Sequence, residues 1–180
     1  AQADEEQQGV LRDDGAGVAS RVSGAGGTGR VLAVDWGQRR FGVALSDPSR
    51  LIAQPLATLT RRPKQRAPVA AVLALITQHD IAEVVVGLPL TPEGGEGEAA
   101  HAARAFAEAL ARRSGRPVTL WDERLSTARA LRAAREAGVK DRDSRGRIDQ
   151  MAAVVILQSW LDAQRSGGAG ARGNGGTDGP

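Results

Sequence analysis

The chain has 180 residues, with 24 Lys and Arg against 21 Asp and Glu, so its formal net charge is +3. This length fits one globular domain, and the absence of cysteine excludes disulfides, thiolate metal sites and a cysteine nucleophile. No uninterrupted apolar run approaches the roughly 20 residues of a membrane-spanning helix. No basic segment followed by an apolar stretch opens the chain, and we therefore expect a soluble, cytoplasmic protein.

Glycine divides the chain into a central part and two tails. Of the 23 glycines, seven lie in residues 1–30 and seven in residues 166–180. Segments of this composition bury too little apolar surface to become ordered, so we expect disordered tails at 1–30 and 166–180. The remaining 31–165 should form a single domain, and it carries 20 basic and 15 acidic residues, a charge of +5.

The first half of this domain predicts three strands and a helix. Two short apolar runs, 31–35 and 41–45, flank a turn at 37–40 and predict a hairpin, and a third strand is expected at 54–59. A helix is expected over 64–79, because Val69, Val72, Leu73 and Ile76 have the spacing of one helix face.

The second half alternates between strands and helices. We expect a buried strand at 84–86, a helix at 99–110, a strand at 118–121, and a helix that Ser126 caps and Gly138 ends. A last, largely apolar helix is expected at 148–161. A hairpin followed by β-α-β-α-β predicts an α/β fold with a mixed sheet flanked by helices.

Three acidic residues are candidates for chemistry, since active sites of such sheets lie at the carboxyl ends of the parallel strands. Asp35 ends the first strand, where a turn-forming role is the alternative. Glu123 follows the 118–121 strand, and strand alternation places it on the side of Trp121, opposite Asp122; a solvated strand end is the alternative.

Asp149 lies in the first turn of the last predicted helix, on its inward face. A favourable interaction with the helix dipole would explain it, typically by about 0.3 to 1 kcal/mol. Yet buried like charges are unfavourable unless they share a cation. A metal ion held by Asp35, Glu123 and Asp149 explains the three acids together better than three separate roles.

Several motifs resemble the YqgF/RuvX family. They are Asp35-Trp36-Gly37-Gln38-Arg39-Arg40-Phe41-Gly42-Val43-Ala44, Ser46-Asp47-Pro48, Gln54-Pro55, Val86-Gly87-Leu88-Pro89-Leu90, Trp121-Asp122-Glu123-Arg124-Leu125-Ser126-Thr127 and Ile148-Asp149-Gln150-Met151-Ala152-Ala153. The resemblance covers 31–165 and implies a ribonuclease-H-like fold and kinship with the RuvC Holliday-junction resolvases. It also implies a nuclease that trims the small-subunit ribosomal RNA precursor, with Asp35, Glu123 and Asp149 as its catalytic, metal-binding acids.

The sequence departs from the family pattern at three places. Thr91 stands where the family commonly has Asn, and Phe41 where a β-branched residue is usual. RuvC-like resolvases also tend to carry a further acid close to the last one, whereas Gly146 and Ala152 lie three residues on either side of Asp149. The absence of that further acid favours metal-dependent cleavage over junction resolution, whereas Phe41 should affect packing alone.

The acids predict phosphodiester hydrolysis assisted by a divalent metal. Two ions about 3.5 to 4 Å apart can acidify the attacking water and stabilise the leaving oxygen, and carboxylate ligands without cysteine indicate Mg²⁺ or Mn²⁺. Asp35 is the expected bridging ligand. Two alternatives remain: a DNA-directed nuclease or Holliday-junction resolvase, and a non-catalytic RNA-binding, ribosome-associated factor. An actin-like ATPase would need a second lobe, which 135 residues cannot supply.

Basic residues near the acids predict binding of nucleic acid, as structured RNA or DNA. The candidates are Arg40, Arg124, Arg129, Arg132, Arg135, Arg142 and Arg145, although Arg40 and Arg124 could instead pair with carboxylates. A second cluster, Arg61, Arg62, Lys64 and Arg66, is either a further phosphate-binding group or a solvated face. The sequence shows no aromatic residues interleaved with these cations, so base stacking is not predicted.

Overall fold

One mixed sheet organises the computed structural model, which describes residues 28–128, 130–131, 133 and 142–169. Its strands are β1 (Arg30–Asp35), β2 (Arg40–Ser46), β3 (Ala53–Thr60), β4 (Ile81–Leu88) and β5 (Val118–Asp122), in the spatial order β3-β2-β1-β4-β5. β2 is antiparallel to both β1 and β3, while β1, β4 and β5 are parallel. β3 therefore runs in the same direction as β1, and the carboxyl ends of β1, β3, β4 and β5 lie at one edge of the sheet.

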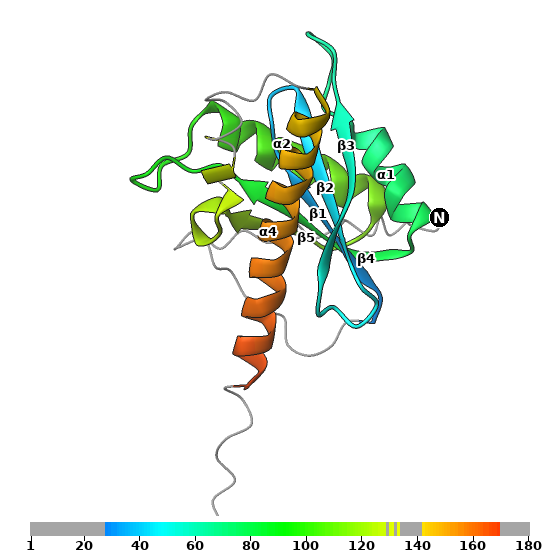
Figure 1. Ribbon diagram of the computed structural model, residues 1–180. Coiled ribbons are helices and arrows are strands. Elements are labelled where there is room, and N and C mark those ends of the chain that lie inside the picture. Colours follow the sequence, from blue (N-terminus) through cyan, green and yellow to red (C-terminus); the bar gives the residue numbers. More distant parts are fainter. Residues whose placement is uncertain (1–27, 129, 132, 134–141, 170–180) are drawn as a thin grey trace, which may run out of the picture.

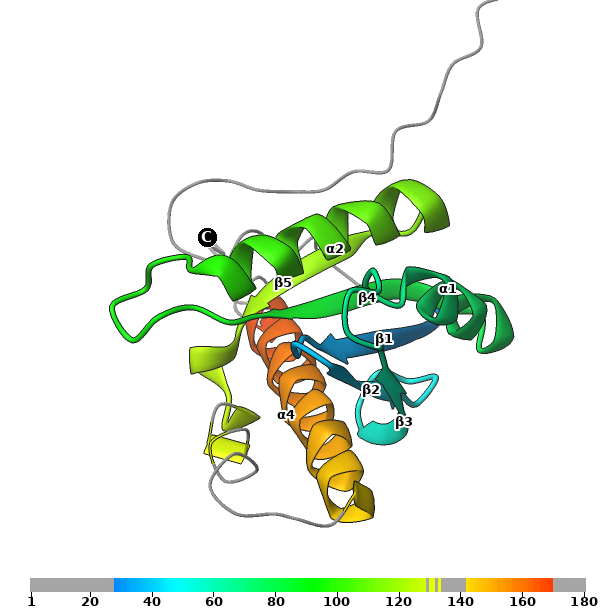
Figure 2. The same ribbon diagram turned by 90° about the horizontal axis from the view of Figure 1, so that it is seen from above.

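Helices cover both faces of the sheet, which confirms the predicted α/β class. α1 (Val69–Gln78) and α2 (Glu98–Ser114) pack on one face, and the long α4 (Arg142–Ala169) crosses the other (Figures 1 and 2). Among the described residues, none of the helices is both long enough and apolar enough to cross a bilayer.

The alternation of side chains along the strands separates two apolar layers. On β1, Leu32 and Val34 join the cluster with α1 and α2, whereas Val31 and Ala33 join the cluster with α4. Because successive side chains of a strand point to opposite faces, Asp35 continues the row of Val31 and Ala33. Its carboxylate therefore belongs to the layer between the sheet and α4.

α1 begins later than predicted. The helix expected over 64–79 starts at Val69, with Pro68 at its N-cap. Proline lacks an N–H and disfavours helical backbone in the residue before it, so Pro68 fixes the start of the helix. The predicted apolar face is confirmed, since Val72 and Ile76 are buried in the core.

α4 is much longer than the predicted helix at 148–161. It begins at Arg142, two turns before Asp149. Only the apolar part of this helix is visible as a periodic pattern, because the Arg-rich first turns carry no apolar face. Asp149 therefore does not lie in the first turn, and the interpretation that it interacts with the helix dipole is wrong.

The helix expected after Ser126 is described only in part. Ser126 Oγ accepts a hydrogen bond from the backbone N–H of Ala128 at 3.3 Å, the interaction of an N-cap. The expected end at Gly138 lies outside the described residues. The two predicted tails also fall almost entirely outside them; β1 begins at Arg30 and α4 ends at Ala169.

Candidate active site

Asp35 ends β1 between two glycines of the neighbouring strands. On one side it pairs in register with Gly42 of β2. On the other side the pair Val34 and Val86 places Gly87 of β4 next to Asp35. Neighbouring strands lie about 4.8 Å apart, so both glycines border the carboxylate of Asp35, which is 1% exposed.

Each of these glycines is covered by one of the other two acids. A Cβ atom on Gly42 would lie 1.8 Å from the carbonyl oxygen of Asp149, so α4 touches the sheet backbone there. A Cβ atom on Gly87 would lie 2.8 Å from Glu123 Oε1. The absence of side chains on the two strands beside Asp35 is what lets Asp149 and Glu123 approach it.

The three predicted acids thus come from three distant parts of the sequence to one edge of the sheet. Asp149 and Glu123 are 1% and 3% exposed, as buried as Asp35. The hard oxygen donors fit Mg²⁺ or Mn²⁺ in kind. In the part of the chain that the structure describes, however, no three His, Asp or Glu side chains are grouped closely enough to hold a metal ion.

Asp122 and Glu123 point to different surroundings, as strand alternation predicts. Trp121 packs in the layer between the sheet and α4. Glu123, two residues further on, lies in the same layer, because Glu123 Oε1 and Ile156 Cδ1 of α4 both lie over Gly87. Asp122 instead binds Arg124, whose Nε and Nη2 donate to Asp122 Oδ2 at 2.9 and 2.6 Å. These hydrogen bonds raise the pKa of Arg124 above its usual value.

Of the other predicted phosphate-binding residues, the structure describes the side chains of Arg40 and Arg145. Arg40 Nη1 lies 4.0 Å from Asp149 Oδ2, so one guanidinium stands beside the buried acids. Arg145 is half-buried in the second turn of α4. Arg129, Arg132 and Arg135 lie outside the described residues, and of Arg142 only the helical backbone is described.

A cavity of about 350 Å³ opens beside Glu123 and Arg124. Its other walls are the loop after β4 and the first turn of α2, with Pro89, Leu90, Thr91, Pro92, Gly97, Glu98 and Ala99. Thr91 acts within the loop, because its Oγ1 accepts a hydrogen bond from Gly95 N at 3.0 Å. Glu123 is thus one of the walls of this cavity, although it is 3% exposed.

The departure at Phe41 affects packing away from the acids. Phe41 is fully buried in the layer of α1 and α2, with its ring 4.9 Å from Trp36 and 6.0 Å from Phe106. The alternative that Arg124 pairs with a carboxylate is confirmed by its bonds to Asp122, whereas sequence reasoning did not single out Gly87 as a site residue. A glycine directly after the apolar run 84–86 is the signal that could have found Gly87.

The strand order and the buried acids at the carboxyl edge define the ribonuclease-H-like class of α/β folds. A solved structure, Thermus thermophilus RuvC in complex with a Holliday junction substrate, is similar with a TM-score of 0.50 and 20% identity. The match covers 77% of this chain and 96% of that one. At this level of identity the similarity concerns the fold alone.

Relatives of known sequence identify the family. A family profile described as "RuvX: Holliday junction resolvase" matches residues 29–163. Proteins named "Putative pre-16S rRNA nuclease" are 46% identical over 137 residues in Anaeromyxobacter sp. and 48% identical over 141 residues in Mycobacterium sp., covering 76% and 78% of this chain and 99% and 83% of the relatives. The chain therefore belongs to the RuvX family, as its motifs predicted.

Proposed function

We propose that this chain is a divalent-metal-dependent nuclease that hydrolyses phosphodiester bonds in the precursor of the small-subunit ribosomal RNA. The observation that supports it best is the placement of Asp149 and Glu123 over the two glycines that flank Asp35. Membership of the RuvX family and the name shared by its relatives favour this substrate.

The burial of the acids favours a cationic ligand. Three carboxylates that are at most 3% exposed lie in one layer, where their negative charges repel one another in a medium of low dielectric constant. Arg40, at 4.0 Å from Asp149, supplies only one positive charge. Under the proposal, Asp35, Glu123 and Asp149 hold one or two divalent ions by their carboxylate oxygens.

A bound divalent ion would acidify a water molecule and stabilise the oxyanion that leaves the phosphorus. Contacts within the protein hold the three carboxylates in place. Pairing of β1 in the sheet fixes Asp35, the backbone contact of α4 with Gly42 fixes Asp149, and the close approach of Glu123 to Gly87 fixes Glu123. Arg40, beside Asp149, and Arg124, next to Glu123 in the sequence, carry guanidinium groups that can bind phosphate oxygens, and Asp122 holds Arg124 in one orientation.

The test combines cleavage, metal binding and RNA binding. We expect Asp35→Asn, Glu123→Gln and Asp149→Asn each to lower Mg²⁺- or Mn²⁺-dependent cleavage of a ribosomal RNA precursor fragment by more than about 100-fold. RNA affinity should stay the same or rise slightly, because a negative charge is removed. Mn²⁺ should raise the melting temperature of the parent protein but not of Asp35→Asn, since a ligand stabilises only the state that binds it.

Asp80→Asn is the matched control. Asp80 is an exposed acid at the opposite edge of the sheet, before β4, and its φ of 49° is a conformation that Asn also adopts. This variant should cleave like the parent. Cleavage by Asp35→Asn at the parent's rate, or cleavage that persists in EDTA, would overturn the metal-dependent mechanism.

A four-way DNA junction belongs in the same assay, because the family profile carries the description of a junction resolvase. Asp149 is the only acid in 146–153, and the inward face beyond it is formed by Ala152 and Ala153. With no further carboxylate there, we expect the RNA precursor to be cleaved faster than the junction.

A further inference from the structure

Cations from three segments, the turn between β1 and β2, residues 61–66 and the start of α4, form one surface at the edge of the sheet, beside β3. We define the β3 basic surface by its members, which are exposed or half-buried: Arg39, Arg62, Lys64, Arg66, Arg145 and Arg147. We propose that this surface binds a base-paired arm of the RNA substrate through its phosphates. The inference rests on the proposed nuclease function and adds where the RNA lies and in which form.

The segment 61–66 leaves the sheet at the edge that carries Asp35. β3 runs parallel to β1, so residues 61–66 follow β3 from the edge where β1 ends. Arg61 N donates to the carbonyl of Arg39 at 3.0 Å, which joins this segment to the turn between β1 and β2. A further backbone bond from Gln65 N to the carbonyl of Arg62, at 3.1 Å, folds Arg62 and Lys64 into a turn.

The start of α4 crosses β3 at Thr58. Thr58 Oγ1 donates to the carbonyl of Gly146 at 2.9 Å and lies 3.3 Å from Gln150 Nε2. Arg145 and Arg147 flank Gly146, so both are held beside the end of β3. Figures 1 and 2 show this gold-coloured end of α4 beside β3. Residues about 80 positions apart in the sequence therefore form one charged surface next to Asp149.

Cations outnumber acids on this surface. No Asp or Glu occurs between Asp47 and Asp80 in the sequence, and Asp143 is the nearest exposed acid on α4. Within the part of the chain that the structure describes, Arg39, Arg62, Lys64, Arg66 and Arg147 form no ion pair. Elsewhere arginines are paired, as Arg50 is with Glu83 at 3.3 Å and Arg124 with Asp122. A surface with this excess of positive charge beside a candidate nuclease site attracts polyanions.

The positions of the aromatic side chains favour paired over unpaired RNA. The whole chain contains three Trp, two Phe and no Tyr. All five lie in the core, with Trp36, Phe41, Phe106, Trp121 and Trp160 between 0% and 9% exposed. Proteins that bind single strands use exposed aromatic rings on which bases stack, and this chain has none to offer. The protein can therefore contact RNA mainly through the phosphates, which a double helix presents in a regular array.

The test is the affinity of the full chain for a blunt RNA duplex, measured by fluorescence anisotropy over a series of KCl concentrations. The variant Arg62→Ala/Lys64→Ala/Arg66→Ala should bind the duplex more than about tenfold more weakly at moderate salt, and its log–log salt slope should be smaller by roughly 2 to 3. Arg147→Ala should lower the slope by about 1. The single strand of the same sequence should bind the parent more weakly than the duplex.

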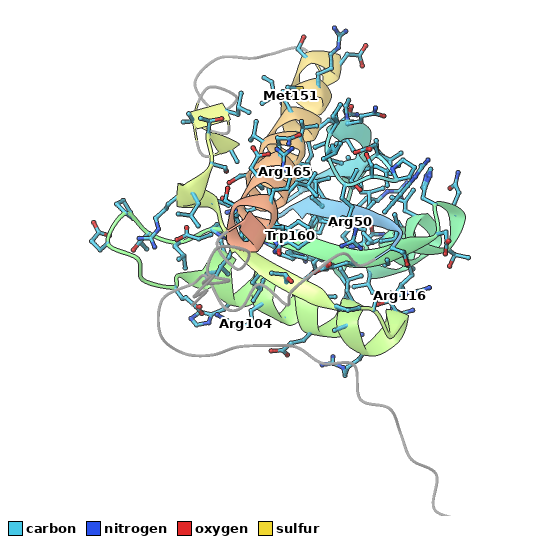
Figure 3. All side chains as sticks on the ribbon, turned by 90° about the horizontal axis from the view of Figure 1, so that it is seen from below. Arg50, Arg104, Arg116, Met151, Trp160 and Arg165 are labelled. Atoms are coloured by element: carbon cyan, nitrogen blue, oxygen red, sulfur yellow. The ribbon has the colours of Figure 1, made fainter. Side chains whose placement is uncertain are left out.

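The matched control is Arg112→Ala/Arg113→Ala/Arg116→Ala, three exposed cations at the end of α2. In Figure 3, Arg116 lies far from Met151, which belongs to the N-terminal half of α4. This variant should keep the parent's affinity. An equal loss in the control, an unchanged affinity of the β3 variant, or tighter binding of the single strand would overturn the proposal, and tighter binding of a DNA duplex would overturn the choice of RNA.

Cleavage at saturating protein separates this proposal from the nuclease function. Arg62, Lys64 and Arg66 lie outside the candidate active site. The variant that replaces all three with Ala should therefore cleave, at saturation, within about twofold of the parent's rate. If the parent binds the duplex through this surface but cleaves no RNA, the nuclease function fails while the binding surface stands. If it cleaves but the β3 variant binds normally, only the surface proposal fails.

Discussion

The Cα atom of Gly42 lies against the backbone of Asp149, where an added Cβ atom would be 1.8 Å from the carbonyl oxygen of Asp149. A strand and a helix whose residues are more than 100 positions apart in the sequence are thus in backbone contact. This contact sets the height of α4 above the sheet and with it the position of Asp149 relative to Asp35.

Gly42→Ala should therefore destabilise the whole domain. Neither the strand nor the helix backbone can yield locally, so we expect the free energy of unfolding to fall by more than about 2 kcal/mol, as overpacked cores do. Urea denaturation of the variant and of a Gly97→Ala control measures this. Gly97 has nothing within 4 Å of its added Cβ, and Gly97→Ala should cost at most about 1 kcal/mol, the loss expected for alanine at the N-cap of α2. Equal stability of Gly42→Ala and the parent would contradict the backbone contact.

Gly87→Ala should impair activity more than stability. The added Cβ meets two side-chain ends, Glu123 Oε1 and Ile156 Cδ1, both at 2.8 Å. Side chains can shift where backbone cannot, so we expect a loss of about 1 to 2 kcal/mol of stability together with displacement of Glu123. RNA cleavage should fall by at least about tenfold. The measurement compares cleavage rate and urea midpoint, and full activity would show that Glu123 does not depend on this glycine.

Gly146→Ala should stabilise the protein. Gly146 lies inside α4, and its added Cβ would be 3.7 Å from Thr58 Oγ1, an ordinary contact. Alanine loses less backbone entropy in a helix, by roughly 0.5 to 1 kcal/mol. Thermal and urea denaturation should show the increase. A decrease would mean that α4 and β3 are packed more tightly at Thr58 than this spacing allows.

Asp47 makes stability dependent on pH in the acid range. Its carboxylate accepts hydrogen bonds from the hydroxyl of Ser49 and from the N–H groups of Ile52 and Leu51, the last two each at 2.7 Å, and these bonds lower its pKa from 3.8 to about 2. The folded-state pKa lies below the unfolded value, so the ionised carboxylate stabilises the fold above pH 3.8. This contribution is lost as the pH falls from 3.8 to about 2.

Asp47→Asn tests this dependence. The variant should melt at a lower temperature than the parent at pH 6, and the difference should shrink between pH 4 and pH 2.5. Differential scanning calorimetry at several pH values measures it. Asp80→Asn, which changes an exposed acid at the opposite edge of the sheet, serves as the control for the substitution itself. A difference between Asp47→Asn and the parent that is constant from pH 6 to pH 2.5 would contradict the assignment to ionised Asp47.

The sequence predicted the positions of the strands, because 31–35, 41–45, 84–86 and 118–121 are short apolar runs, although β4 (Ile81–Leu88) extends beyond the predicted 84–86. Helix limits were less certain. α1 was expected to begin at residue 64 but begins at Val69, because Pro68 ends the non-helical segment before it. The first turns of α4 are helical but polar, so they show no periodic pattern of apolar residues in the sequence. The candidate acids were accessible from the sequence because each stands directly at the end of an apolar run or on an apolar helix face.

What the sequence by itself determined is the alternation of side chains along each strand, which assigns Asp35 and Glu123 to a face of the sheet, and the family motifs that carry them. Only the tertiary structure decided which faces meet. Three contacts join segments that are far apart in the chain. The strand register places Gly42 and Gly87 beside Asp35, and the backbone of Asp149 contacts Gly42. The bond between Thr58 and Gly146 brings residues 61–66 close to Arg145 and Arg147. Such contacts depend on sheet order and helix placement, which arise from the packing of the whole core and have no local signature in the sequence.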